Sequence, residues 1–328
     1  MLQVGSILDG KYKILSLVGQ GGTSNIWLAI NERLNLTVAV KEYHFFDSRS
    51  YQYWKTQYLS EVNTLKELRH SGLPIIYDII IQDDSPIIVM SYIQGEPLSN
   101  VLTAQGCISE NHVIGWAKQL CDILMYLHSQ TPPIIYRDLK PSNIMLQPSG
   151  QLALIDFGTS MVQSSGDTIS LGTRGYAAPE QYNSDPSTLD IRIDIYALGV
   201  TLHHLLTGKD PALPPYDLTP IRMINPELSK GLEQIIIKCT ALDPDQRYQS
   251  VKELMSDLYS YQEDNSSISR NNLFTLVKQL FHRLRKLFTK ESQSTRPHSQ
   301  VSTTHVTHST DLISYNVDIL MTLYDNKE

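Results

Sequence analysis

Residues 136–158 read YRDLKPSNIMLQPSGQLALIDFG. Two short segments of this stretch, separated by an apolar run, carry four polar residues: Asp138, Lys140, Asn143 and Asp156. One carboxylate can accept the proton of an incoming hydroxyl group, and an ammonium group can neutralise a moving phosphoryl group. An amide and a second carboxylate can hold a magnesium ion. The stretch therefore predicts a phosphate-transfer site.

Both segments have alternative interpretations when each is taken alone. Asp138 and Asn143 can face one centre, and Pro141 restrains the loop between them. A charged helix start is the alternative, although the apolar flanks IIYR and NIML argue against a solvated one. A single DFG sequence is usually a turn from Asp to Gly. Here Asp156 follows the apolar pattern LALI, and the two segments are predicted to converge.

The whole chain has the composition of a globular protein. Of its 328 residues, 41% are hydrophobic and 19% are charged, so it can hold one large domain or two average ones. The net charge of -7 gives no general reason to expect nucleic-acid binding. The three cysteines have no metal-like spacing and fit a reducing interior.

Neither a secretory signal nor a membrane span is predicted. The N-terminal sequence MLQVGSILDGKYKI lacks a continuous apolar region after positive charge. The most apolar run, IIYDIIIQDDSPIIVMSYI, is interrupted by Asp78, Asp83 and Asp84. We expect a cytoplasmic protein, either free or held at the periphery of a membrane.

The first part of the chain has the pattern of strands. The segments KYKILSLV, SNIWLAI and LTVAVKEY lie between Tyr12 and about Met90 and predict a small antiparallel sheet. In YLSEVNTLKELRH, apolar residues recur at helical spacing and leave Glu61 on the flank of the stripe. Helical patterns dominate from Asn111 onward, and SYIQGEPL is the expected connector. The sequence predicts a strand-rich lobe followed by a helix-rich lobe.

The composition changes after Tyr261. We expect an ordered domain over residues 8–261, a polar linker and a basic amphipathic helix over 262–290, and a flexible Ser/Thr/His-rich tail over 291–328. Residues 270–290 contain six Lys and Arg and no acid. This helix can dock on the domain or on a partner, or it can lie on an anionic membrane surface. Docking is favoured, because amphipathic stripes usually pack against protein.

A glycine-rich segment precedes a lysine-bearing strand. GQGGTSNIW contains Gly19 and Gly21, whose lack of a side chain lets backbone amides approach phosphate oxygens. By itself it is more often an ordinary turn. The interpretation as a phosphate-binding loop is strengthened by the order of the predicted elements: a strand, the glycine loop, a strand ending in Lys41, and a helix bearing Glu61. A buried Lys41 needs a partner of opposite charge, and Glu61 is a suitable one. Taken alone, Lys41 can be a charge at the edge of a strand, and Glu61 can be a solvated residue on the flank of a helix.

Through these motifs the chain resembles the eukaryotic-type protein kinases, in particular their bacterial serine/threonine branch, over roughly Leu8 to Tyr261. The resemblance implies an α+β, bilobal protein-kinase fold. Its N-lobe would be a small antiparallel sheet with one helix, and its C-lobe would be larger and helical. The implied cofactors are ATP and two Mg²⁺ ions, with Mn²⁺ as an alternative.

The resemblance also implies a role for individual residues. Asp138 would be the catalytic base, Lys140 the γ-phosphate contact, and Asn143 and Asp156 the metal ligands. Lys41 would grip the α- and β-phosphates with Glu61 as its partner. The other implied ATP-binding residues form the glycine loop, the adenine sandwich and the hinge: Gly19, Gly21, Ser24, Ile26, Ala39, Met90, Ser91, Tyr92, Ile93 and Met145.

Several structural roles follow from the same resemblance. Ala178, Pro179 and Glu180 would close the activation segment, with Arg247 as the salt-bridge partner of Glu180. Asp194 would brace the catalytic loop. These are further expectations of the resemblance.

Three residues depart from the family pattern. Ser24 replaces the third glycine of the loop, and Tyr136 replaces the usual His, keeping an aromatic plane under Phe157. Pro97 stands where many members have an acidic ribose contact, which leaves Glu96 or Ser99 for that role.

The substrate class is expected to be protein Ser/Thr hydroxyls. Lys140 and the Gly172-Thr173 pair are similar to those of serine/threonine kinases, and Thr173 is expected to hydrogen-bond both Asp138 and Lys140. Arg137 beside the base indicates control by phosphorylation of the activation segment. Thr168 and Ser170 are the candidate acceptors, unless these hydroxyls only cap or solvate a loop.

The sequence thus predicts an active serine/threonine protein kinase with protein substrates and no nucleic-acid partner. A second copy of the chain is a further expected partner, for trans-autophosphorylation. One alternative is a pseudokinase scaffold that binds nucleotide and partners without turnover. The other is a small-molecule phosphotransferase that shares the fold.

Overall fold

We describe the chain from a computed structural model, which defines residues 2–21, 24–43, 66–82, 85–157, 161–162, 172–182 and 189–261. For residues 85–86 and 161–162 it defines the backbone alone. The chain divides into two compact units, and all described residues belong to the first, Met1–Asn265. The segments predicted at 262–290 and 291–328 lie outside the described residues, so their boundaries remain predictions.

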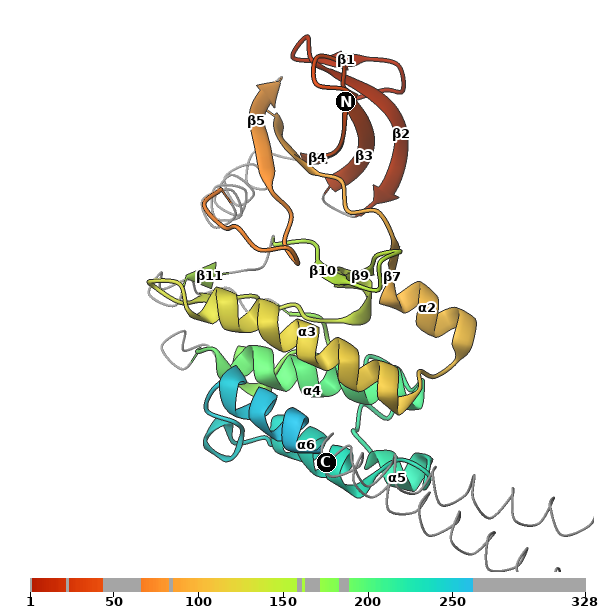
Figure 1. Ribbon diagram of the computed structural model, residues 1–328, viewed down its shortest axis with the longest axis vertical. Coiled ribbons are helices and arrows are strands. Elements are labelled where there is room, and N and C mark those ends of the chain that lie inside the picture. The colour runs from red at the N-terminus through yellow and green to blue at the C-terminus, as the bar shows by residue number, and fades with distance from the viewer. Residues whose placement is uncertain are drawn as a thin grey trace, which may run out of the picture. The chain divides into compact units, whose positions relative to one another are not determined.

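The first part of the described chain forms an antiparallel sheet (Figure 1). Its strands, in spatial order, are β1 (Ile7–Leu8), β2 (Tyr12–Gln20), β3 (Ser24–Asn31), β4 (Leu36–Tyr43), β6 (Ser85–Ser91) and β5 (Ile76–Gln82). Side chains of β3 alternate between buried and partly exposed positions, the period of a strand with one face on a core. The predicted antiparallel sheet is confirmed, and β1 and the β5–β6 hairpin extend it.

The hairpin of β2 and β3 contains the glycine segment. Its register shifts at two places, the second between Leu17 and Gly19. Such bulges increase the local twist of a strand. The N–H of Gly21 then donates to the carbonyl oxygen of Ser24 at 2.8 Å. The helix predicted around Glu61 lies outside the described residues.

Helices make up most of the later part of the domain. Their bounds are α2 (Leu98–Gln105), α3 (Glu110–His128), α4 (Arg192–Thr207), α5 (Ile221–Ile224) and α6 (Lys230–Cys239), and residues 251–261 are also helical. Helix α4 packs against both α3 and α6 (Figure 1). From Ile193 to Leu206 it is buried on all sides, as expected for the central helix of a core. The helix-rich lobe is confirmed.

Two small sheets connect the main sheet to the helices. In the first, β9 (Ile144–Leu146) pairs with β10 (Leu152–Leu154) and with β7 (Glu96–Pro97). In the second, β8 (Ile134–Ile135) pairs with β11 (Met161–Val162). The hairpin of β9 and β10 explains the convergence predicted from the sequence. It begins directly after Asn143 and ends just before Asp156, so both residues emerge at the same end.

Candidate active site

The loop from Tyr136 to Asn143 is anchored to helix α4 through its backbone. Asp194, in the first turn of α4, accepts the N–H of Tyr136 through Oδ2 at 2.9 Å and the N–H of Arg137 through Oδ1 at 2.8 Å. Arg137 has φ +73°, an uncommon conformation for a residue with a side chain. Two hydrogen bonds to one fully buried carboxylate offset that strain, and Asp194 has the bracing position expected for it.

Three side chains converge on the carboxylate of Asp138. The amide nitrogen of Asn143 and the ammonium nitrogen of Lys140 lie 2.9 and 2.8 Å from Oδ2. The hydroxyl of Thr173 donates to Oδ1 at 2.6 Å, and the N–H of Thr173 lies 3.2 Å from the same oxygen. Lys140 also donates a hydrogen bond to the Thr173 hydroxyl. The contacts expected between Thr173, Asp138 and Lys140 are therefore present.

Local sequence explains how this cluster forms. Pro141 is the first residue of a short 3-10 turn, Pro141–Asn143, a position where its missing N–H costs nothing. Asn143 ends the turn, and its Nδ2 also donates to the backbone oxygen of Asp138 at 2.9 Å. The turn thus directs Asn143 back toward Asp138. Asp138 itself is 8% exposed, so its charge depends on these donors.

Asp156 forms an ion pair with a lysine of the main sheet. Nζ of Lys41, on β4, lies 3.0 Å from Oδ1 of Asp156. The side chain of Lys41 is 7% exposed, whereas that of Asp156 is 54% exposed. Asp156 has φ +70°, an uncommon conformation for a residue with a side chain. The N–H of Ile155 donates to the carbonyl oxygen of Asn143 at 3.0 Å, which connects the two segments.

Tyr136 contacts the DFG segment through its ring and its hydroxyl group. Its ring meets that of Phe157 edge to face, with centroids 5.0 Å apart and an interplanar angle of 75°. Its hydroxyl donates to the carbonyl oxygen of Ile155 at 2.6 Å. Burial raises the pKa of Tyr136 well above its ordinary value, so the phenol stays protonated and remains a donor. The tyrosine therefore both packs against Phe157 and hydrogen-bonds the residue before Asp156.

The expected nucleotide residues lie on three neighbouring parts of the fold. Gly19 lies opposite Ile26 in the β2–β3 hairpin, and Ala39 lies opposite Met90 in the pairing of β4 with β6. Met145, on β9, lies opposite Pro97. Ser91, Tyr92 and Ile93 connect these two sheets and are all partly or largely exposed. Gly21 and Ser24 close the hairpin, as described above.

Between β11 and Glu180, the activation segment is described from Gly172 onward. Glu180 is buried and forms a two-pronged ion pair with Arg247, with distances of 2.6 and 2.9 Å. Paired guanidinium and carboxylate groups are the arrangement that a buried charge requires. The ion pair predicted for these residues is present. Three other predicted residues lie outside the described part of the chain: Glu61, Thr168 and Ser170.

The donor set is compatible with a hard divalent metal ion. Both hydrogen bonds of the Asn143 amide are donated by its nitrogen, and its oxygen accepts none from the described residues. An amide oxygen and a half-exposed carboxylate, that of Asp156, are ligands that such ions prefer. Within the described ranges no cluster of three or more His, Cys, Asp or Glu gathers. Phosphate oxygens would have to complete the coordination of a metal ion.

Two residues that sequence reasoning missed also hold the loop. Nε2 of His128, in the last turn of α3, lies 2.8 Å from Oδ2 of Asp194. Gln181 donates to the carbonyl oxygen of Arg137 at 3.3 Å and accepts the N–H of Ala178 at 2.8 Å. A histidine near a helix C-terminus is common for electrostatic reasons alone, so its position carried no specific signal.

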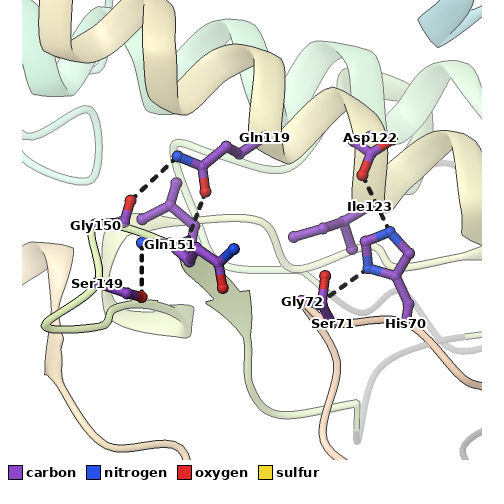
Figure 2. A pocket seen from close by; sticks show the side chains of 10 residues that line it. His70, Ser71, Gly72, Gln119, Asp122, Ile123, Ser149, Gly150 and Gln151 are labelled. Carbon is purple, nitrogen blue, oxygen red and sulfur yellow. Dashed lines mark hydrogen bonds and ion pairs between the residues drawn. The ribbon is translucent and has the colours of Figure 1, made fainter.

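A separate pocket of about 350 Å³ lies between α3 and the turn that joins β9 to β10 (Figure 2). Its polar groups bond to each other. His70 contacts both the N–H of Gly72, at 3.0 Å, and Asp122, at 3.2 Å. Gln119 bridges the carbonyl oxygen of Gly150 and the N–H of Leu152. None of the expected site residues lines this pocket, so we place the candidate active site at Asp138.

Comparison with known proteins agrees with this geometry. The protein kinase domain family matches residues 12–263. Serine/threonine-protein kinase PrkC of Bacillus subtilis is 32% identical over 271 residues, which are 78% of this chain and 41% of that protein. A probable serine/threonine-protein kinase of Clostridium acetobutylicum is 28% identical over 298 residues, 84% of this chain and 43% of that protein.

A third relative, serine/threonine-protein kinase PknB of Mycolicibacterium smegmatis, is 28% identical over 277 residues, 78% of this chain and 44% of that protein. The chain therefore spans less than half the length of these relatives. In the described part of the chain, no helix is both long and apolar enough to cross a bilayer.

Proposed function

Because this chain belongs to the protein kinase domain family, we propose that it is a serine/threonine protein kinase that transfers the γ-phosphate of ATP to protein hydroxyls. One observation carries the proposal. The carboxylate of Asp138 holds the hydroxyl of Thr173 at 2.6 Å through one oxygen, while Lys140 and Asn143 bind the other. A carboxylate that already accepts a hydrogen bond from a hydroxyl group in this geometry can orient an incoming substrate hydroxyl in the same way.

In the proposed phosphoryl transfer, Asp138, Lys140 and Lys41 each have a separate task. Asp138 orients the acceptor hydroxyl and takes its proton as the bond to phosphorus forms. Lys140, whose ammonium lies 2.8 Å from Asp138, stabilises the charge that develops on the transferred phosphoryl group. Lys41 would bind the α- and β-phosphates, and the backbone of the loop with Gly19 and Gly21 would contribute N–H donors to them. Positioning and electrostatic stabilisation supply most of the rate, because phosphoryl transfer leaves little covalent work for the protein.

The protein kinase domain family uses ATP with a divalent metal ion. We assign Mg²⁺ to this chain, with Mn²⁺ as the alternative ion. Asn143 and Asp156 would hold the ion, which supplies neutralisation of phosphate charge when bound. Adenine would lie against Ile26, Ala39 and Met145, with its polar edge on the backbone of residues 90–93. Glu96 or Ser99 remains the candidate for ribose, since Pro97 has no side-chain donor or acceptor.

The choice of Ser/Thr acceptors rests on Lys140 and Thr173. Their side chains bond to each other and to Asp138, which makes the surroundings of the candidate base polar and closely packed. A short aliphatic hydroxyl fits this arrangement better than the hydroxyl of a tyrosine ring, which stands farther from its backbone. The serine/threonine kinases named among the relatives support the same assignment.

Activation by autophosphorylation is a further part of the proposal. The guanidinium of Arg137, adjacent to the base, can pair with a phosphate on the activation segment. Thr168 and Ser170 are the expected acceptors of the γ-phosphoryl group of ATP, and a second copy of the chain is expected to catalyse the transfer. Mass spectrometry after incubation with ATP and magnesium tests this. Phosphate absent from the whole segment between Asp156 and Glu180 would contradict it.

The basic segment at 270–290 is proposed to dock on the domain or on a partner, with an anionic membrane surface as the alternative. We propose a cytoplasmic location, with peripheral membrane association if that alternative holds. Deleting the chain from Arg270 onward separates the two. Unchanged fractionation between membrane and soluble fractions would exclude the membrane alternative.

Nucleotide binding and turnover, measured on the same samples, test the main proposal. Wild-type protein and Asp138→Asn should both bind ATP with magnesium, while ADP and phosphoprotein accumulate only with the wild type. Asp217→Asn is a matched control, because Asp217 is exposed and its carboxylate accepts a hydrogen bond from the hydroxyl of nearby Thr219. Binding without turnover by the wild type would indicate a scaffold. Phosphate on a small molecule but on no protein would indicate the other phosphotransferase class.

A further inference from the structure

Arg174 lies one residue beyond the Thr173 side chain that touches the candidate base. The N–H and hydroxyl of Thr173 both bond to Oδ1 of Asp138, so the backbone at this point is fixed on the acceptor site. Consecutive Cα atoms are about 3.8 Å apart, and one further residue of an extended chain adds about 3.3 to 3.6 Å. A substrate residue next to the acceptor hydroxyl must therefore pass within reach of Arg174.

The side chain of Arg174 is held by aromatic rings. Its guanidinium carbon lies 4.1 Å from the centroid of the Tyr216 ring. It also lies near Tyr182, whose pKa is raised by burial and lowered in part by the positive charge of Arg174. A guanidinium stacked on a ring is restrained, while the N–H groups at its edge stay available to an acceptor.

Two features shape the loop that carries Tyr216. Gly175 has φ +88°, and a Cβ at this position would lie 2.4 Å from the carbonyl oxygen of Pro211, so the two loops are in direct contact. Tyr216 has φ +61°, and its N–H donates to the carbonyl oxygen of Leu213 at 3.0 Å. An uncommon backbone conformation of this kind is kept only where the surroundings determine it.

Arg174 has no anionic partner within the described residues. It is exposed, and it forms no ion pair with a carboxylate there. The basic side chains Arg192 and Arg247, in contrast, are both paired with carboxylates. A restrained and exposed guanidinium beside the acceptor site is thus available to a ligand.

We propose that Arg174 makes this chain select protein substrates that carry an anionic side chain beside the hydroxyl to be phosphorylated. The anion is a carboxylate of Asp or Glu or the phosphate of an already phosphorylated residue, since a guanidinium binds both in two-pronged fashion. The inference rests on the proposed function and names the substrate class of the same site. Tyr216 is a positioning residue that acts through Arg174.

Degenerate peptide libraries test the proposal. Each has a fixed Ser or Thr acceptor and, at one neighbouring position, Asp, phosphoserine or Asn. The wild-type chain should show a kcat/KM for the Asp and phosphoserine libraries that exceeds that for the Asn library by about fivefold, the upper range for an exposed ion pair. The two anionic libraries distinguish carboxylate from phosphate as the preferred group.

Variants assign the preference to the named residues. Arg174→Gln should bring the ratio of Asp to Asn libraries close to one, and Arg174→Glu should invert it. Tyr216→Leu should weaken the ratio, and Tyr216→Phe, which retains the ring, should preserve it. Arg33→Gln is the matched control, an exposed arginine on the turn that follows β3.

The outcomes separate two kinds of failure. Equal phosphorylation of the Asp, phosphoserine and Asn libraries by the wild type would overturn the role of Arg174 and leave the proposed function intact. A preference that survives in Arg174→Gln would do the same. A chain that phosphorylates neither peptide nor protein would overturn the proposed function and this inference with it.

Discussion

The amide nitrogen of Asn143 lies 2.9 Å from Oδ2 of Asp138 and donates a hydrogen bond to it. A second bond from the same nitrogen, to the backbone oxygen of Asp138, fixes the orientation of the amide. One side chain therefore positions the candidate base with its nitrogen, and in the proposed function its oxygen would bind the metal ion.

Asn143→Ala should lower kcat by about 100-fold or more, because it removes a preorganised donor to a charged group together with a metal ligand. Steady-state kinetics at several magnesium concentrations provide the measurement. The magnesium concentration for half-maximal rate should also rise. Asn225→Ala, whose side chain serves only a local turn, is the control and should keep both values. An unchanged magnesium dependence in Asn143→Ala would contradict the dual role.

Tyr136→Phe should lower the free energy of unfolding by about 1 to 3 kcal/mol, because the partly buried carbonyl oxygen of Ile155 loses a donor. The edge-to-face contact with Phe157 stays, so kcat should fall less than in Asn143→Ala. Urea unfolding followed by circular dichroism measures the loss. Tyr259→Phe provides the control, since that half-exposed ring contacts Lys118 by its face. Equal losses in the two variants would remove the proposed support of the DFG segment.

Gly95→Ala should raise the KM for ATP and destabilise the fold by about 1 to 3 kcal/mol. Gly95 has φ +149°, and a Cβ there would lie 2.2 Å from the carbonyl oxygen of Leu146. The clash would displace β7 from β9, and with it Met145. In Gly115→Ala, a position in α3 with open space around it, stability should rise by about 0.5 to 1 kcal/mol. A Gly95→Ala protein with wild-type KM would show that this strand pair does not shape the nucleotide site.

Much of the fold followed from pattern. Alternation predicted the strands up to β4, and apolar spacing predicted α3, α4 and α6 to within a few residues. Helix α2 was not predicted, because it has only eight residues, follows Pro97 and has no side-chain cap. Short helices of this kind depend on tertiary packing, here through buried Leu98 and Leu102, which no local signal reports.

The site residues also differed in how well the sequence predicted their contacts. Asp138, Asn143 and Asp156 belong to a compact motif, so spacing alone brought them together. Contacts between residues that lie far apart in the sequence could not be predicted from spacing. The carboxylate of Glu42 accepts the N–H of Leu2 at 2.7 Å and the indole N–H of Trp27 at 3.0 Å, a buried link from sheet to N-terminal segment. Such pairs depend on strand register and need the folded structure.

Acid should destabilise the domain through buried His204. Burial lowers its pKa below the ordinary 6.5, and its Nδ1 lies 2.5 Å from the hydroxyl of Tyr176, whose pKa burial raises. Below pH 6.5 the unfolded chain binds a proton at this residue before the folded chain does, so stability falls as pH falls toward the folded pKa. Urea unfolding between pH 7.5 and about 5.5 should show a smaller decline in His204→Gln than in the wild type. Identical declines would contradict this assignment.

Transfer of labelled γ-phosphate from ATP to protein tests the central claim most directly. The wild type and Asp217→Asn should label Ser and Thr, identified by phosphoamino-acid analysis. Asp138→Asn should label protein at least about 100-fold more slowly, because it lacks the base, although the side chain keeps its size and one acceptor oxygen. Equal labelling by Asp138→Asn, or label on Tyr alone, would contradict the account.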